Sequence, residues 1–221
     1  RLGWSEATAR WLVGVVDRGV PVLGICYGHQ LLAHALGGTV IYHPGGREIG
    51  TVPVQQTATG RADPLFADLP ETFPAHVVHS QTVAVLPPGA SILAYNDFEP
   101  HHAFRVGESA WGVQFHPEFS VEATRACIVE VERGLRKAGV DPEALAATVR
   151  LPVLRRTWPL TRICGSSLLV WASSVFSARW RSSNSRFSGV SSRRPSGSGA
   201  GWASAGTAAV ASMSSSAIRR E

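Results

Sequence analysis

A glycine-flanked cysteine, placed between a strand pattern and a helix pattern, constrains the fold of this chain more than any other feature. Residues 18–25 (R-G-V-P-V-L-G-I) form a short, valine-rich apolar run, which predicts a buried parallel strand. Residues 27–36 have leucine and alanine at helical spacing and end at a glycine pair, which is typical of a helix terminus. Ser5–Asp17 predicts a further amphipathic helix upstream. This order of elements indicates an α/β fold.

Cys26 lies at the centre of this junction, in the sequence Gly24-Ile25-Cys26-Tyr27-Gly28. The sequence has the G-x-S-x-G pattern of a nucleophile elbow, with cysteine in place of serine. Gly24 and Gly28 suit such a turn because the backbone approaches too closely there for a Cβ atom. A sulfur at a helix N-terminus favours the thiolate, which is the nucleophilic form of cysteine. The alternative interpretation is a structural buried cysteine with two packing glycines.

Between residues 39 and 113 the sequence changes to β-branched runs, which are separated by turns rich in proline, glycine and asparagine. The predicted strands are Thr39–Tyr42, Thr51–Gln56, His76–Leu86 and Ser91–Tyr95. The predicted helical segments are a single turn at Asp63–Leu69, a surface helix at Val121–Ala138 and a short last helix at Asp141–Val149. Strands and helices of this kind are consistent with one α/β domain over residues 1–150.

A second reactive pattern, W-G-V-Q-F-H-P-E, contains His116, which lies 90 residues after Cys26. A predicted strand leads into His116, and Glu118 comes two positions later, within reach of the far nitrogen of the imidazole. The order Cys, His, Glu supplies a nucleophile, a general base and a group that orients the base. A His-x-Glu pair alone is a weak signal, so its value here comes from its occurrence together with the cysteine turn.

The extended motifs G-I-C-Y-G-H-Q and G-V-Q-F-H-P-E closely resemble those of the class I, triad-type glutamine amidotransferases. Segments 35–50 and 76–86 resemble the stand-alone, GMP-synthase-like branch of that family. The resemblance extends from Trp4 to Lys137. It implies a three-layer, flavodoxin-like α/β sandwich with a mixed, mostly parallel sheet.

The resemblance also implies a reaction. Cys26 would attack the side-chain carbonyl of glutamine and form a γ-glutamyl thioester. His116 would take the thiol proton, deliver it to the leaving ammonia and then activate water, while Glu118 orients the imidazole. The backbone N–H of Tyr27 would be one oxyanion donor.

Substrate-binding positions follow from the same resemblance. Gln30, four residues after the cysteine, occupies a position that helps to hold glutamine. The stretch His79-Ser80-Gln81 aligns with the strand that contacts the α-amino and carboxylate end of the substrate, although it departs from the commoner S-H-G-D form. Segment 47–50 (R-E-I-G) resembles a family segment that borders the pocket, and a purely structural role is equally consistent with the sequence.

Only 25 residues precede Cys26, whereas family members usually have a longer segment there. That segment normally contributes the first strands and a glycine-rich loop with the second oxyanion N–H. We therefore expect residues 1–150 to be an amidotransferase domain that lacks its N-terminal part. Two alternatives stay open: a γ-glutamyl peptide hydrolase of the same superfamily, and a catalytically inactive binding homologue without the oxyanion strand. The chain shows no acceptor-domain signature, so ammonia would pass to a separate partner enzyme.

The charge of the chain changes sign at residue 151. Residues 1–150 hold 11 Lys and Arg against 15 Asp and Glu, whereas residues 151–221 hold 10 Arg, 18 Ser and a single acid, Glu221. This composition predicts a disordered, Ser/Arg-rich low-complexity tail. A reading-frame error near residue 151 would explain it as well. Nucleic-acid binding through arginine and tryptophan, or membrane contact through Ile163–Ala178, is a less favoured interpretation of the tail.

The spacing of cysteine and histidine predicts no metal or cofactor. Cys26, Cys127 and Cys164 are too few and too scattered for a disulfide scaffold or a zinc site. His101 and His102 are adjacent, so they would point to opposite sides of a strand. The sequence has neither a run of 18 apolar residues nor a basic-then-apolar leader. We therefore expect a cytoplasmic protein with no membrane partner.

Overall fold

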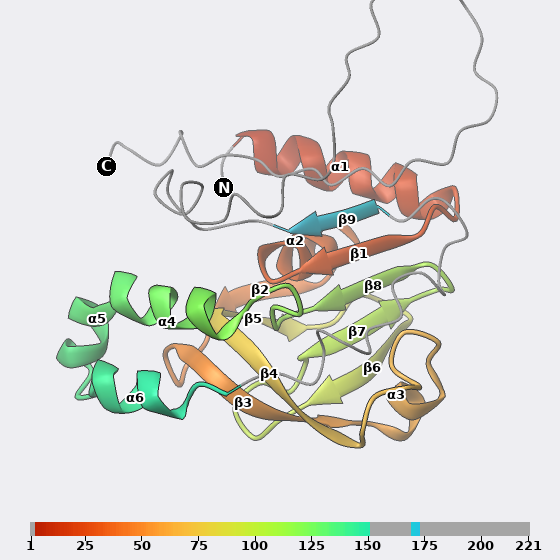
Figure 1. Ribbon diagram of the computed structural model, residues 1–221. Coiled ribbons are helices and arrows are strands. Elements are labelled where there is room, and N and C mark those ends of the chain that lie inside the picture. The colour runs from red at the N-terminus through yellow and green to blue at the C-terminus, as the bar shows by residue number, and fades with distance from the viewer. Residues whose placement is uncertain (1–2, 151–168, 173–221) are drawn as a thin grey trace, which may run out of the picture.

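The computed structural model of this 221-residue chain describes residues 3–150 and 169–172 (Figure 1). The helices are α1 (Gly3–Asp17), α2 (Tyr27–Ala35), α3 (Ala58–Ala62), α4 (Val121–Glu130), α5 (Glu132–Lys137) and α6 (Pro142–Thr148). The strands are β1 (Val22–Ile25), β2 (Thr39–Tyr42), β3 (Glu48–Gln56), β4 (Thr72–His79), β5 (Gln81–Val85), β6 (Ala90–Tyr95), β7 (Ala103–Val106), β8 (Ala110–Val113) and β9 (Leu169–Ala172).

Seven strands form one mixed sheet in the order β4-β3-β6-β7-β8-β1-β9, while β2 and β5 pair separately. The expected α/β class with a mixed sheet is confirmed. The balance of directions differs from the expectation, because β1 pairs in parallel with β8 and β9, whereas the remaining pairs of the described strands are antiparallel. Short turns join most strands between residues 72 and 113, and short turns favour antiparallel pairing, since parallel pairing needs a longer crossover.

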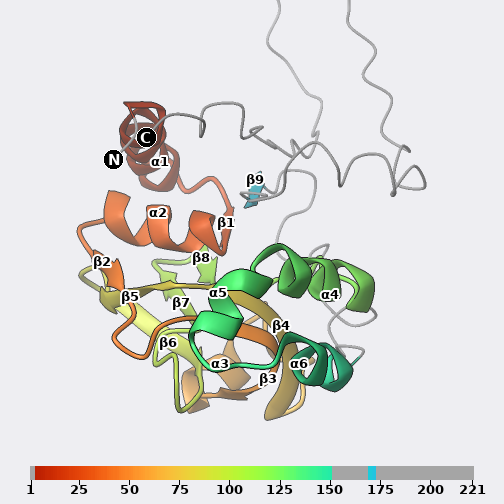
Figure 2. The same ribbon diagram turned by 90° about the vertical axis from the view of Figure 1, so that its left-hand side faces the viewer.

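The helices cover the strands from two sides, which gives the three-layer arrangement (Figure 2). α1 and α2 pack together, and α2 lies against β1 and β8, where Leu32 and Phe104 are buried. α4 and α6 lie against β3 on the other side. A third apolar cluster, separate from those beside α2 and α4, is formed mainly by strand residues. In it the rings of Phe66, Phe73 and Phe115 contact one another. Burial of these apolar side chains stabilises the layers around the end of β1.

Several predicted elements have different limits in the structure. The single strand expected at 76–86 is two strands, because the chain leaves the large sheet at Ser80 and β5 then pairs with β2. The helix expected at 121–138 is broken at Val131 into α4 and α5. The single helical turn expected at 63–69 is confirmed, because the N–H groups of Phe66 and Ala67 donate to the carbonyl oxygen of Asp63 at 3.0 and 2.8 Å. The short helix before it, α3, was not predicted; the side chain of Thr57 accepts from the N–H of Gly60 and caps it. Strand β7 was not predicted.

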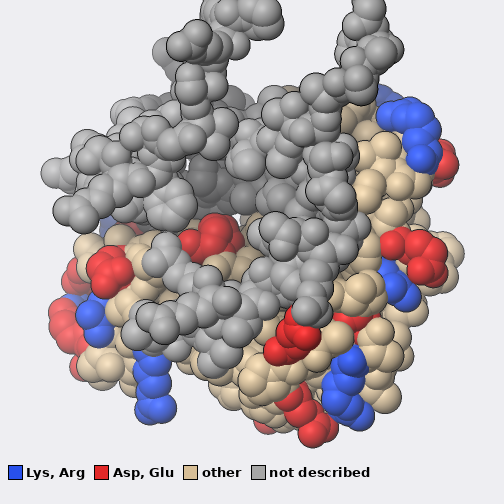
Figure 3. Space-filling model, turned by 45° about the vertical axis from the view of Figure 1, so that its right-hand side comes forward, with Lys and Arg blue, Asp and Glu red and all other residues tan. Residues whose placement is uncertain are grey.

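The segment 151–221, expected as a disordered tail, lies outside the described residues except for Leu169–Ala172. These four residues form β9 and pair in parallel with β1. The pairing satisfies backbone groups along the second edge of β1, which sequence reasoning had left open. In Figure 3, basic and acidic side chains are interspersed over the visible described surface. No helix within residues 3–150 is long and apolar enough to cross a membrane.

Candidate functional site

Cys26 lies at a sharp turn between β1, which ends at Ile25, and α2, which begins at Tyr27. Its backbone has φ 52° and ψ −104°, and it is the one non-glycine residue with positive φ in the described part of the chain. Such a conformation is strained and is often found at functional sites. A Cβ atom on Gly24 would lie 2.5 Å from the carbonyl oxygen of Gly28, so the turn requires glycine at position 24.

The topology brings Cys26 and His116 to the same edge of the sheet. β1 and β8 are parallel neighbours, with Ile25 opposite Val113, so their carboxyl ends lie side by side. The N–H of Cys26 donates to the carbonyl oxygen of Val113 at 2.8 Å. His116 follows β8 by three residues, and its N–H donates to the carbonyl oxygen of His76 at 2.7 Å. Residues that are 90 positions apart in the sequence therefore lie close together.

His116 is held by the residues that follow it. Its Nδ1 lies 2.8 Å from Oε1 of Glu118, and its ring stacks on Phe119 with the ring centres 3.9 Å apart. The imidazole is buried, whereas the Glu118 side chain is 40% exposed. Nε2 of His116 makes no hydrogen bond of ordinary geometry within the described residues. The stacked ring and the Nδ1 contact leave this nitrogen as the reactive end of the imidazole.

Electrostatics link His116 to Cys26. Burial by itself lowers the pKa of His116, but the charges of the Glu118 carboxylate and the Cys26 thiolate outweigh this and raise the pKa to about 10. The second free cysteine of the described residues, Cys127, behaves differently, because burial raises the pKa of its thiol to about 12. The surroundings of His116 therefore favour the imidazolium form of this residue at neutral pH.

A pocket of about 250 Å³ opens beside the sulfur of Cys26. Its lining includes five of the predicted site residues, Cys26, Tyr27, Gln30, His79 and Ser80, but neither His116 nor Glu118. The other lining residues are Tyr42, Arg47, Val78, Gln81, Cys127, Glu130 and Val131. The pocket thus has an apolar wall and two exposed side chains of opposite charge, Arg47 and Glu130.

The predicted substrate-binding residues differ in what they offer to the pocket. Nε2 of Gln30 donates to the carbonyl oxygen of Gln81 at 3.2 Å and to Oε1 of Gln114 at 3.0 Å. Its Oε1 is therefore the atom that remains for a ligand. Oγ of Ser80 accepts from Nε of Arg47 at 3.0 Å. His79 makes its hydrogen bonds inside the protein, with its side chain 1% exposed.

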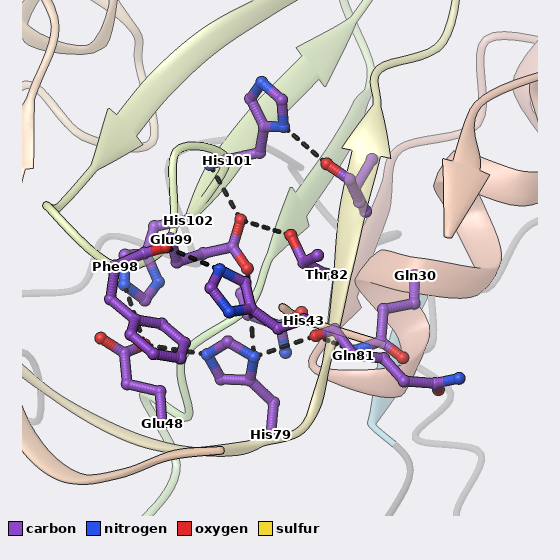
Figure 4. Close-up of polar contacts among 12 residues, drawn as sticks. Gln30, His43, Glu48, His79, Gln81, Thr82, Phe98, Glu99, His101 and His102 are labelled. Carbon is purple, nitrogen blue, oxygen red and sulfur yellow. Dashed lines mark hydrogen bonds and ion pairs between the residues drawn. The ribbon is translucent and has the colours of Figure 1, made fainter. Parts of the chain in front are cut away.

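His79 belongs to a buried polar cluster behind the pocket wall (Figure 4). Its Nε2 lies 2.8 Å from Oε2 of Glu48, whose other oxygen accepts from Nδ2 of Asn96 at 2.7 Å. Nε2 of His102 is 3.3 Å from the same Glu48 oxygen, and a carboxylate oxygen of Glu99 is 4.0 Å from Nδ1 of His79. Burial raises the pKa of Glu48, but the two imidazoles and the amide outweigh it and hold the pKa well below its ordinary value.

Sequence reasoning missed several residues of this site. Cys127 and Glu130 come from α4, and their spacing of three places them on one helix face, which is a signal too common to be informative. Gln114 lies inside the G-V-Q-F-H-P-E motif, so its position in the motif was the available signal. Arg47 lines the pocket, as the resemblance of segment 47–50 suggested. Within residues 3–150 and 169–172, no group of three or more His, Cys, Asp or Glu could hold a metal ion.

Comparison with known proteins agrees with this geometry. The family model for glutamine amidotransferase class-I matches residues 4–132. A GMP synthase (glutamine-hydrolyzing) of Thermomicrobium roseum is 43% identical over 104 residues, which is 47% of this chain and 19% of the relative. The corresponding protein of Streptomyces avermitilis is 37% identical over 169 residues, which is 74% of this chain and 31% of the relative. The chain thus spans less than a third of the length of these curated relatives.

Two solved structures have a similar fold. A glutamine amidotransferase of Thermotoga maritima superposes with a TM-score of 0.55 at 28% identity, covering 65% of this chain and 60% of the other. A glutamine amidotransferase of Methylobacillus flagellatus superposes with a TM-score of 0.53 at 24% identity, covering 74% and 61%, and this likeness shows the fold alone. Because the family model matches more than half of the residues, the chain belongs to the class-I glutamine amidotransferase family.

Proposed function

We propose that this chain hydrolyses the side-chain amide of glutamine through Cys26, His116 and Glu118, and that it releases ammonia for an acceptor. The observation that carries the proposal is the raised pKa of His116 beside a strained cysteine that opens onto a pocket. A thiolate, an imidazolium and a carboxylate in sequence are the groups that acyl transfer from an amide needs.

The first half of the reaction is acylation. Sγ of the Cys26 thiolate attacks the amide carbonyl carbon of glutamine, and the carbonyl electron pair moves to oxygen. The N–H of Tyr27, at the N-terminus of α2, would stabilise that oxyanion. As the carbonyl re-forms, the C–N bond breaks, and Nε2 of His116 gives its proton to the leaving nitrogen. The products are ammonia and a γ-glutamyl thioester.

The second half is hydrolysis of the thioester. Neutral His116 removes a proton from water, and the resulting hydroxide attacks the thioester carbonyl carbon. The C–S bond breaks, glutamate leaves, and the sulfur returns to the thiolate beside the imidazolium. Glu118 stabilises the imidazolium in both halves through its contact with Nδ1.

The charges at the pocket suit an amino acid. Glutamine carries an α-carboxylate and an α-ammonium, and the pocket presents the guanidinium of Arg47 and the carboxylate of Glu130. Arg47 would hold the α-carboxylate with the help of Ser80, since the two are already hydrogen-bonded. Oγ of Ser80 and Oε1 of Gln30 would complete the site. We assign His79 to support of the pocket wall, because its ring nitrogens are bonded inside the protein.

The relatives support a proposal for the destination of the ammonia. Glutamine amidotransferases use glutamine and pass ammonia to a partner synthase domain or subunit, and the relatives reported above are GMP synthases. We propose an acceptor of the same synthase class for this chain. The free thiol of Cys26 needs a reducing environment, which favours action in the cytoplasm.

A glutaminase assay tests the proposal. We expect glutamate and ammonia in equal amounts from glutamine, and no product with Cys26→Ser. Labelling with a glutamine-like chloroketone should modify Cys26 and should be slowed by glutamine. Hydrolysis of γ-glutamyl peptides without hydrolysis of glutamine would instead identify a γ-glutamyl peptide hydrolase. A folded protein whose Cys26 resists the chloroketone would contradict the proposal and favour an inactive binding homologue.

A further inference from the structure

Gln114 is fully buried and has no role in the reaction described above. Its Nε2 donates to Sγ of Cys26 at 3.5 Å, and its Oε1 accepts from Nε2 of Gln30 at 3.0 Å. Its backbone N–H donates to the carbonyl oxygen of His102 at 2.8 Å, which holds the chain in place. One side-chain amide therefore contacts the candidate nucleophile at one end and a pocket residue at the other.

The orientation of both amides is decided by their partners. Nε2 of Gln30 faces two acceptors, the carbonyl oxygen of Gln81 and Oε1 of Gln114, and an amide nitrogen has one hydrogen for each. A reversed Gln114 would bring its Nε2 against Nε2 of Gln30 and its Oε1 against the Cys26 sulfur. The first of these contacts would be repulsive, since donor would face donor, and the second would take this donor away from the sulfur. Nε2 of Gln114 is therefore the atom directed at the sulfur.

The hydrogen bonds continue from Gln81 to a buried carboxylate (Figure 4). The carbonyl oxygen of Gln81 is 3.0 Å from Nδ1 of His79, and Nε2 of His79 is 2.8 Å from Oε2 of Glu48. The carbonyl of Gln81 and the carboxylate of Glu48 are acceptors, so each ring nitrogen of His79 faces an acceptor. The far end of the chain of contacts is thus a buried pair, His79 and Glu48, and its hydrogen bonds hold it rigidly.

We propose that Gln114 positions and stabilises the Cys26 thiolate, and that the hydrogen-bonded relay from Glu48 through His79, Gln81 and Gln30 holds Gln114 in place. A donor on the sulfur stabilises the thiolate before attack and again when the sulfur leaves the thioester. The effect of this hydrogen bond on turnover rests on the proposed function, whereas the contact between Gln114 and the sulfur can be tested without glutamine.

The test uses a small electrophile that does not need the pocket. The full chain is treated with iodoacetamide at pH 7, and alkylation of the peptide that contains Cys26 is followed by mass spectrometry. Gln114→Met keeps the length of the side chain and removes the donor. We expect alkylation of Cys26 to slow about tenfold, because one charge-assisted hydrogen bond to the sulfur is lost.

Gln56→Met is the matched control. Gln56 is also a buried glutamine, and its Nε2 donates to the carbonyl oxygens of Leu69 and Pro70 at 2.9 Å each. It does not line the pocket. The control should lose a comparable amount of thermal stability and should leave the alkylation rate of Cys26 within about twofold of the starting protein.

Gln114→Glu provides a second variant if Gln114→Met does not fold. Its carboxylate still accepts from Gln30 but cannot donate to the sulfur, so alkylation should again slow. An unchanged rate in either folded variant would overturn the inference, as would equal slowing in the Gln56→Met control. Slowing in the Gln114 variants of a protein that does not hydrolyse glutamine would support the contact with the sulfur and would count against the proposed function alone.

Discussion

Nδ1 of His116 lies 2.8 Å from Oε1 of Glu118, although only Pro117 separates the two residues in the chain. The contact fixes which imidazole nitrogen faces the carboxylate and which one is available to Cys26. Stacking of the same ring on Phe119 restricts its remaining rotation. A short local motif therefore orients the imidazole, and the parallel pairing of β1 with β8 brings the sulfur of Cys26 to the same edge of the sheet.

Glu118→Gln should lower kcat for glutamine by about 10²-fold, with a smaller change in KM. The variant keeps the size of the side chain but removes the charge that stabilises the imidazolium, so the pKa of His116 should also fall. Steady-state kinetics and an NMR titration of the histidine measure both effects. A kcat within about threefold of the starting protein would show that Glu118 is not needed to orient the base.

Stability should depend on pH through His116. Its pKa rises from 6.5 in the unfolded chain to about 10 in the folded protein, so the folded state binds the proton more tightly. This contribution is fully present below pH 6.5 and is lost as the pH rises toward 10. We expect the free energy of unfolding, measured with urea, to fall across that range, and the fall should be smaller in His116→Gln. If the free energy of unfolding fell equally with pH in both proteins, the raised pKa of folded His116 would be contradicted.

Gly24→Ala should destabilise the protein by about 3 kcal/mol, because the new Cβ would lie 2.5 Å from the carbonyl oxygen of Gly28 and backbone must move. The comparison is Gly14→Ala within α1, where the new Cβ would meet only the flexible end of Arg18. That control should be neutral or slightly stabilising, since alanine favours helix. Chemical unfolding measures the difference. Equal stability of the two variants would show that the turn at Cys26 tolerates a side chain before it.

Arg47→Met should raise KM for glutamine about tenfold and change kcat little, because the guanidinium would bind the α-carboxylate of the substrate and not the reacting amide. Arg61→Met is the control, since Arg61 forms an exposed ion pair with Glu71 and does not line the pocket. Initial rates over a range of glutamine concentrations separate the two constants. A lower kcat with an unchanged KM would place Arg47 in the chemical step instead.

Local sequence patterns predicted most elements of the described fold well. α2 was predicted close to its observed limits, because a glycine pair follows its last turn. β1 was predicted with the correct end at Ile25, but the strand begins at Val22 and not at residue 18. Residues 76–86 were predicted as one strand, since their β-branched pattern continues through Ser80 and does not show that two different partner strands are used. The sheet was expected to be mostly parallel, and the larger number of antiparallel pairs was missed for the same reason. Pairing partners lie far away in the sequence, and propensity carries no information about them.

By itself the sequence determined that Cys26 stands at a strand-to-helix turn and that His116 and Glu118 lie within reach of each other. Both features are local, because glycine positions and a two-residue spacing set them. Only the tertiary structure decided that Gln30, Gln81 and Gln114 form one hydrogen-bonded path to the sulfur. Gln30 lies in α2, Gln81 begins β5 and Gln114 directly follows β8, and they meet because burial of apolar side chains packs those elements together.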